Sequence, residues 1–243
     1  MKCFSFSKRN IKELIRDPLT IVFGIAFPIV LLGLLTLIQS HIPAELFTID
    51  KLAPGMTVFA LSFFSLFSGL LLAKDRTDAF LIRLYSSPMR PTDFILGYIL
   101  PFIPLGLLQS AICYLFSAIL GLKLSVNVLF AVIVNLPVCI MFISIGLLAG
   151  SCLNDKQVGG ITGALLTNLS AWLSGIWFDL SLMGDALKKV AYALPFANAV
   201  DAAKAAYAGD FSAVISPLLI VLGYTIVLTA LSVIIFKAKT KNN

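Results

Sequence analysis

Six long apolar segments dominate the sequence and restrict the folds that it can adopt. They cover about residues 19–38, 54–73, 94–120, 126–150, 158–178 and 214–236. A helix needs roughly 20 apolar residues to cross a hydrocarbon core about 30 Å thick. The chain of 243 residues is 59% hydrophobic and 12% charged, whereas soluble domains carry roughly 25% charged residues. The sequence therefore predicts an all-α, multi-pass membrane protein with six transmembrane helices in one domain, residues 1–243.

The distribution of positive charge predicts which side of the membrane the termini face. Six crossings leave both termini on one side. That side holds thirteen of the 18 lysines and arginines: those of the N-terminal segment, of the loop 74–93, of the turn at Lys156 and of the tail after Phe236. Because cytoplasmic loops retain Lys and Arg, we expect cytoplasmic termini and a location in the plasma membrane of a bacterium.

Residues 3–17 predict an amphipathic helix that lies along the membrane interface. One face would carry Phe4, Ser7, Ile11, Leu14 and Ile15, and the other Lys8, Arg9, Lys12, Glu13 and Arg16. A short basic amphipathic segment next to a membrane span usually lies in the interface. The alternative is that its cations only set the topology. Asp17-Pro18 would end the helix, because proline disfavours helical backbone at the preceding residue.

The external segment 179–212 is longer than a hairpin needs and contains two amphipathic patterns. The first places Leu182, Ala186, Leu187, Val190 and Leu194 on one face, and the second places Phe196, Val200, Ala203 and Tyr207 on one face. Pro195 separates the two patterns and would break a continuous helix. We expect two short helices at or dipping into the outer interface, with a loosely ordered loop as the alternative.

The residue types needed for catalysis or metal binding do not cluster in the sequence. His41 is the single histidine, and we expect it to be a solvated loop residue. The four cysteines are Cys3, Cys113, Cys139 and Cys152. None lies in a long external loop, so we expect no disulfide framework, and their spacings do not fit a metal site. The run from Gly159 to Gly163 lacks the lysine of a phosphate-binding loop and is interpreted as a site of close helix packing. We expect no catalytic residue, no metal and no cofactor in this chain.

None of the six apolar segments contains a charged residue or histidine in its core. Proton-coupled carriers generally need buried titratable groups, so the pattern disfavours a carrier that powers itself. Uncharged polar groups do occur, and most such groups join helices together. A functional alternative is that some of them line a path for a bulky amphiphile together with aromatic residues, and the candidates are Phe63, Phe64, Phe67, Asn135, Asn168 and Trp172.

The loop 74–93 is longer than a simple connection between two spans requires. It has four cations, three acids and an apolar cluster of Phe80, Leu81, Leu84 and Tyr85, closed by Ser87-Pro88. A short helix with such apolar anchors suits a groove on a soluble partner. The alternative is that its cations only fix the topology. Since the spans hold no energy-converting groups, this loop is the best candidate for the point where a partner supplies energy.

At this loop the sequence resembles a known family, the permease subunits of type-2 ABC transporters, which are mostly exporters. The resemblance extends over nearly the whole chain and includes Arg83-Leu84-x-x-Ser87-Pro88, the stretch from Asp93 to Gly97 and Leu194-Pro195-Phe196. It implies that the loop contains a coupling helix that contacts a separate ATPase subunit. The implied contact residues are Phe80, Leu81, Arg83, Leu84, Tyr85, Ser87 and Pro88.

The resemblance also implies the rest of the assembly. Two permease chains, identical or paralogous, would enclose the path, lined partly by spans 2 and 5, and the segment before the last span would form re-entrant helices. ATP and Mg²⁺ would bind the ATPase and not this chain, and no nucleic acid is involved. The resulting hypothesis is export of an amphiphilic drug, antibiotic, peptide or lipid-like compound by alternating access. The alternatives are a membrane sensor or assembly protein without transport activity, and a secondary carrier.

Overall fold

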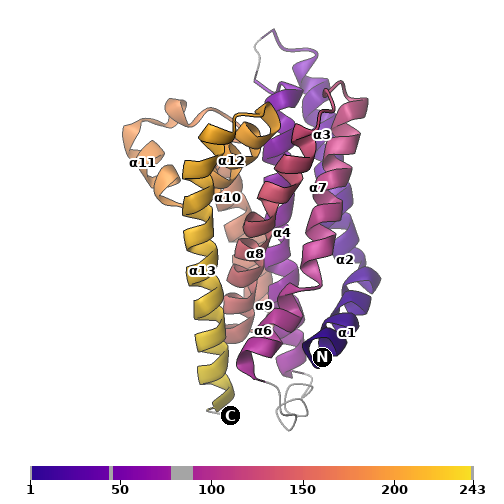
Figure 1. Ribbon diagram of the computed structural model, residues 1–243, viewed down its shortest axis with the longest axis vertical. Coiled ribbons are helices and arrows are strands. Elements are labelled where there is room, and N and C mark those ends of the chain that lie inside the picture. Colours follow the sequence, from indigo (N-terminus) through magenta and orange to yellow (C-terminus); the bar gives the residue numbers. More distant parts are fainter. Residues whose placement is uncertain (1, 44–45, 78–89, 242–243) are drawn as a thin grey trace.

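The computed structural model describes residues 2–43, 46–77 and 90–241, and every regular element in these ranges is helical. Figure 1 shows an elongated bundle whose long helices run nearly along one axis. The elements are α1 (Lys2–Arg16), α2 (Pro18–Ile21), the π-helix Val22–Ala26, α3 (Phe27–Gln39), α4 (Ile49–Thr77), α6 (Pro91–Ile99), α7 (Phe102–Ile119), α8 (Asn127–Cys152), α9 (Asp155–Val158), the π-helix Gly159–Leu166, α10 (Thr167–Leu173), the 3₁₀ helix Leu180–Met183, α11 (Asp185–Ala193), α12 (Pro195–Ala208) and α13 (Phe211–Lys241).

Among the described residues, five helical stretches are long and apolar enough to cross a membrane. They are Pro18–Gln39, Ile49–Thr77, Pro91–Ile119, Asn127–Cys152 and Phe211–Lys239. These five match the apolar segments expected at 19–38, 54–73, 94–120, 126–150 and 214–236. The third stretch is interrupted between α6 and α7, at Leu100 and Pro101, because a proline within a helix removes a backbone donor and clashes with the preceding turn.

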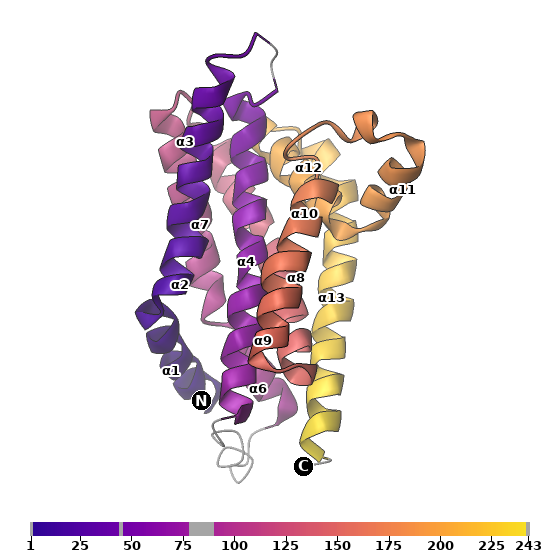
Figure 2. The ribbon, with the colours of Figure 1, turned by 180° about the vertical axis from the view of Figure 1, so that it is seen from behind.

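The sixth expected span, 158–178, corresponds to the helical segment formed by α9, the π-helix and α10. This segment is helical over 155–173 but is not among the five stretches that meet the criteria of length and apolarity, so six spans remain a prediction. Both views show it running from the end where the termini lie toward the other end of the bundle (Figures 1 and 2). The N-terminal helix and the end of α13 lie at the same end of the molecule.

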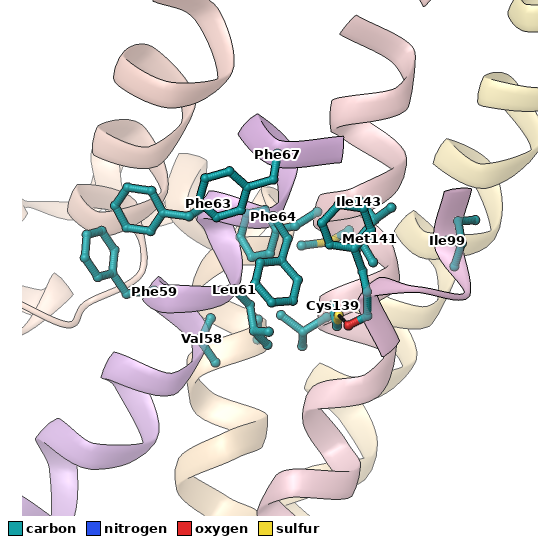
Figure 3. Packing of buried hydrophobic residues seen from close by; sticks show 14 of the residues in the cluster. Val58, Phe59, Leu61, Phe63, Phe64, Phe67, Ile99, Cys139, Met141 and Ile143 are labelled. Atoms are coloured by element: carbon teal, nitrogen blue, oxygen red, sulfur yellow. Dashed lines mark hydrogen bonds between the residues drawn. The ribbon is translucent and has the colours of Figure 1, made fainter. Parts of the chain in front are cut away.

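The central helix of the bundle is α4. It is buried along most of its length, and Figure 3 shows its residue Phe64 beside Met141 and Ile143 of α8, whereas Phe59 and Phe63 point to the other side of α4. The closest approach of α4 to α8 depends on glycine, since a Cβ at Gly146 would overlap the backbone carbonyl of Ser65. The glycine run that the sequence interpretation singled out packs less tightly: within the described residues nothing lies within 4 Å of a Cβ built at Gly159 or Gly160. A Cβ built at Gly163, in contrast, would meet the Leu66 side chain of α4 at 3.1 Å. The interpretation as close helix packing therefore holds at Gly163 and is wrong for the single chain at Gly159 and Gly160.

Helix α1 forms as expected and ends at Arg16. The next residue, Asp17, caps α2, because its carboxylate accepts a hydrogen bond from the Leu19 N–H. The predicted division of its faces is wrong in part. Phe4 is 71% and Ile15 56% exposed, whereas Phe6 and Asn10 are buried. The helix packs on the bundle through the face that carries Phe6, Asn10 and Leu14, and its apolar residues Phe4 and Ile15 point away from the protein.

The segment before the last long helix contains two helices that meet at Pro195, as the sequence predicts. In α12, Phe196, Val200 and Ala203 are buried, and this stripe packs against α4, α8 and α13. The apolar residues of the first pattern behave differently, because Leu182, Leu187 and Val190 are exposed. The helix α11 therefore projects from the side of the bundle (Figures 1 and 2).

Candidate coupling site and substrate path

A buried ion pair joins α1 to the end of α4, next to the loop 78–89. The Arg9 guanidinium donates hydrogen bonds to both carboxylate oxygens of Asp75, at 2.6 and 2.7 Å. The Tyr98 hydroxyl of α6 donates a third hydrogen bond to the same carboxylate, at 2.7 Å. Asp75 is 2% exposed, so one carboxylate holds together α1, α4 and α6.

Apolar contacts and one further hydrogen bond also hold α1 close to α6. The Phe6 ring packs edge-on against Tyr98, with 4.9 Å between ring centroids. The amide of Asn10 donates a hydrogen bond of 3.1 Å to the Gly97 carbonyl. A Cβ at Gly97 would overlap the Phe6 ring, so only glycine lets α1 approach α6 this closely. We call the set Phe6, Arg9, Asn10, Asp75, Gly97 and Tyr98 the α1 junction.

The electrostatics of the α1 junction favour the charged pair. Burial lowers the pKa of the Arg9 guanidinium, but the hydrogen bonds and negative charge of Asp75 outweigh this effect and hold the pKa above its usual value. Arg9 also contacts Glu13, one turn further along α1, at 2.8 Å. A bidentate pair of this kind is stronger and more directional than a single hydrogen bond between neutral groups.

Further contacts anchor the segments on both sides of the loop. Arg76 donates hydrogen bonds to the carbonyls of Gly150, at 2.8 Å, and Leu153, at 3.4 Å, near the end of α8. After the loop, the Asp93 carboxylate accepts a hydrogen bond from the Arg90 N–H, and Pro91 occupies the first turn of α6, where a missing N–H costs little. The predicted coupling residues themselves, Phe80, Leu81, Arg83, Leu84, Tyr85, Ser87 and Pro88, lie outside the described residues.

Four of the six predicted path residues lie inside the bundle. Phe63, Phe64 and Phe67 are 7% exposed or less, and Phe64 packs against Phe102 of α7. Asn135 is buried as well, and its amide donates hydrogen bonds to the hydroxyls of Thr57 and Ser110. In the single chain these four side chains join helices, as most polar and aromatic groups in a membrane bundle do.

The other two path residues lie on the outer face of α10. Trp172 is 57% exposed, and the Asn168 amide donates a hydrogen bond of 2.7 Å to the Ala164 carbonyl within its own helix. Both border an open hollow of about 510 Å³ together with Gly160, Ala164, Leu165 and Leu169. The structure therefore does not bring the six predicted residues into one site.

The α1 junction was not anticipated from the sequence. Arg9 and Asp75 are 66 residues apart, and no spacing rule connects a residue of an amphipathic helix with one near the end of a distant helix. A weak signal was present in Asn10, an uncharged polar residue on a helix whose other polar residues are mostly charged. Its position beside Phe6 and Leu14 on one helical face is compatible with a polar contact inside a packed interface.

Comparison with known proteins places the whole of this region in one family. Residues 1–207 match the family model described as "ABC-2 type transporter". The match covers α1, the complete α1 junction, the loop and α10. The comparison with curated proteins found no match.

Proposed function

Because the chain belongs to the ABC-2 type transporter family, we propose that it is the permease subunit of an exporter driven by a separate ATPase. Two permease chains and two ATPase subunits form the complex, and ATP and Mg²⁺ bind the ATPase. Six crossings, cytoplasmic termini and re-entrant helices α11 and α12 complete the arrangement. The substrate is an amphiphile, and ATP binding drives the outward opening of the path.

The observation that carries this proposal is the α1 junction. Arg9, Asp75 and Tyr98 connect three helices near the end of α4, and Asp75 lies three residues before residue 78. Arg76 connects the same end of α4 to α8. A displacement of the loop by a partner would therefore move α1, α4, α6 and α8 together, because these polar contacts and the packed helices around them resist separate motion.

The test is the double substitution L84D/Y85D, which removes the apolar anchors of the loop. The complete transporter, with its ATPase, is assayed for ATP-dependent uptake of substrate into inside-out vesicles, which corresponds to export from the cell. We expect membrane insertion to persist and ATP-dependent transport to be lost. The matched control is L46D, which introduces an acid at another exposed leucine, in the connection between α3 and α4. Unimpaired export by L84D/Y85D would refute the coupling role.

Two other functions predict different results. A sensor or assembly protein would show no ATP-dependent transport even with an intact ATPase. A secondary carrier would continue to transport without ATP and stop when the proton gradient collapses. The secondary carrier is disfavoured, since Asp75 is the only Asp, Glu, Lys, Arg or His among the described residues that is fully buried, and a proton relay needs such groups within the spans.

A further inference from the structure

The exposed side of α1 carries a basic stripe beside an apolar edge. Lys8, Lys12 and Arg16 recur at every fourth residue and so lie one above the other on the helix. All three are exposed, and the exposed Phe4 and Ile15 lie beside them. The basic stripe lies beside Arg9 of the α1 junction, and both border one hollow.

The basic stripe borders an open hollow of about 800 Å³ between α1 and the start of α2. Two acids also border this hollow, and both are engaged by other groups. Glu13 pairs with Arg9 at 2.8 Å, and Asp17 accepts hydrogen bonds from the Leu19 N–H and the Thr20 hydroxyl. Within the described part of the chain, Lys8, Lys12 and Arg16 have no ion-pair partner, so the hollow has a surplus of positive charge.

The hollow lies next to the start of a candidate membrane span. Pro18, which borders it, is the first residue of the spanning stretch Pro18–Gln39. Leu19, Ile21 and Val22 follow and are about half exposed, as expected for side chains that face lipid. Arginine and lysine clusters on an amphipathic helix next to a span attract anionic lipids, and the neighbouring apolar edge inserts among the acyl chains.

We propose that Lys8, Lys12 and Arg16 form a binding site for the headgroup of an anionic phospholipid. The phosphate would lie in the hollow at the start of α2, and Phe4 and Ile15 would contact the acyl chains. The site goes beyond the proposed transport role and requires only that Pro18–Gln39 crosses a membrane. A bound lipid would contact α1 next to Arg9, the partner of Asp75, and would thereby fix the position of the α1 junction relative to the bilayer surface.

The test uses the full chain reconstituted in nanodiscs of phosphatidylcholine with a minor fraction of phosphatidylglycerol. After mild extraction, native mass spectrometry counts the phosphatidylglycerol molecules retained per protein. We expect K8Q/K12Q/R16Q to retain at least about five-fold fewer phosphatidylglycerol molecules than the wild type. The reason is that each basic side chain near an anionic surface raises the affinity roughly five-fold. The conservative variant K8R/K12R/R16K should retain it, which separates charge from correct folding.

The matched control is K156Q/K237Q/K239Q, which removes three exposed lysines at the same end of the molecule. It should retain phosphatidylglycerol as the wild type does. Equal retention by K8Q/K12Q/R16Q and the wild type would overturn the site, and so would an equal loss in the control. Displacement of the lipid by inorganic phosphate would assign the hollow to a free anion instead. If K8Q/K12Q/R16Q retains as much phosphatidylglycerol as the wild type but no longer binds the ATPase subunit, the basic stripe contacts the protein partner and not a lipid.

Discussion

The carboxylate of Asp75 accepts hydrogen bonds from Arg9 and Tyr98, and thereby ties the N-terminal helix to the two helices that border the loop 78–89. Asp75 is 2% exposed, while the Arg9 side chain is 37% exposed. Removal of one partner of a buried pair leaves the other charge uncompensated. The pair is therefore expected to contribute both to stability and to the transmission of movement from the loop.

The first prediction concerns this pair. D75N should lower the free energy of unfolding by about 2 kcal/mol, below the range for fully buried pairs because water still reaches Arg9. In the double variant R9Q/D75N the two losses should be less than additive, since the second substitution removes a group that has already lost its partner. Thermal unfolding in detergent measures the stability, and ATP-driven export measures the coupling.

The control for the pair is Y98F, which removes one hydrogen bond but leaves both charges. We expect it to cost about 1–2 kcal/mol and to impair export less than D75N does. Additive losses for R9Q and D75N would mean that the ion pair makes no contribution of its own.

The second prediction concerns Gly97. G97A places a methyl group against the Phe6 ring, so α1 must move away from α6. Overpacking of this kind typically costs about 1–3 kcal/mol, and the cost should shrink in an F6A background. The matched control is G223A on α13, where nothing within the described residues lies within 4 Å of the added carbon. If G97A and G223A unfold at the same temperature, the proposed close packing of α1 on α6 is wrong.

Much of the fold could be predicted from local signals. Apolar length identified five candidate spans, and the helix breaks at Asp17-Pro18 and at Pro195 follow from the geometry of proline. The sixth segment, 155–173, is harder to interpret because Gly159, Gly160 and Asn168 dilute its apolar character. Its helical path was predicted, but its last helical residue is Leu173 and not Phe178.

The faces of the helices could not be predicted as well. Periodicity assigned Phe4 and Ile15 to the same apolar face as Leu14, yet only Leu14 is buried. In a protein that borders lipid, apolar residues are stable both against the protein and against the acyl chains, so hydrophobicity alone does not indicate which side packs. The same ambiguity explains why Phe63 and Trp172 were assigned to one path although the first is buried and the second exposed.

The third prediction tests the outer face of α10 as part of the substrate path. W172A should raise the substrate concentration that half-saturates ATP-driven export about ten-fold, because loss of a stacked indole costs roughly 1.5 kcal/mol. W172F should restore most of the affinity. The control L219A removes an exposed side chain of α13, on a different helix. An unchanged half-saturating concentration in W172A would exclude this face from the path.

The last prediction concerns pH and the corner between α11 and α12. The Tyr192 hydroxyl donates a hydrogen bond of 3.0 Å to the Asp201 carboxylate. Burial raises the pKa of Asp201, and the Tyr192 hydrogen bond and the charge of Lys204 oppose this effect only in part. The native state therefore binds more protons than the unfolded state at pH values above the ordinary carboxyl pKa, so the contribution of this group to stability falls as the pH rises above about 4.

Substitution of Asp201 should remove this dependence. We expect the melting temperature of D201N to depend less on pH in the acidic range than that of the wild type. The difference in melting temperature between D201N and the wild type should increase by about 2 °C or more from the acidic to the neutral end of this range. Burial lowers the pKa of the neighbouring Lys204, but from an alkaline value. Its titration therefore changes the stability at higher pH and does not affect the acidic range in which Asp201 is tested.

Two variants separate titration of Asp201 from a change in packing. Y192F removes a hydrogen bond that lowers the pKa of Asp201, so it should raise that pKa further and steepen the acidic profile. D185N removes an exposed carboxylate of α11 and should leave the profile parallel to that of the wild type. If the melting temperatures of D201N and the wild type change with pH in parallel, the Asp201 carboxylate does not titrate in this range. The contact between α11 and α12 would then contribute to stability only through its packing.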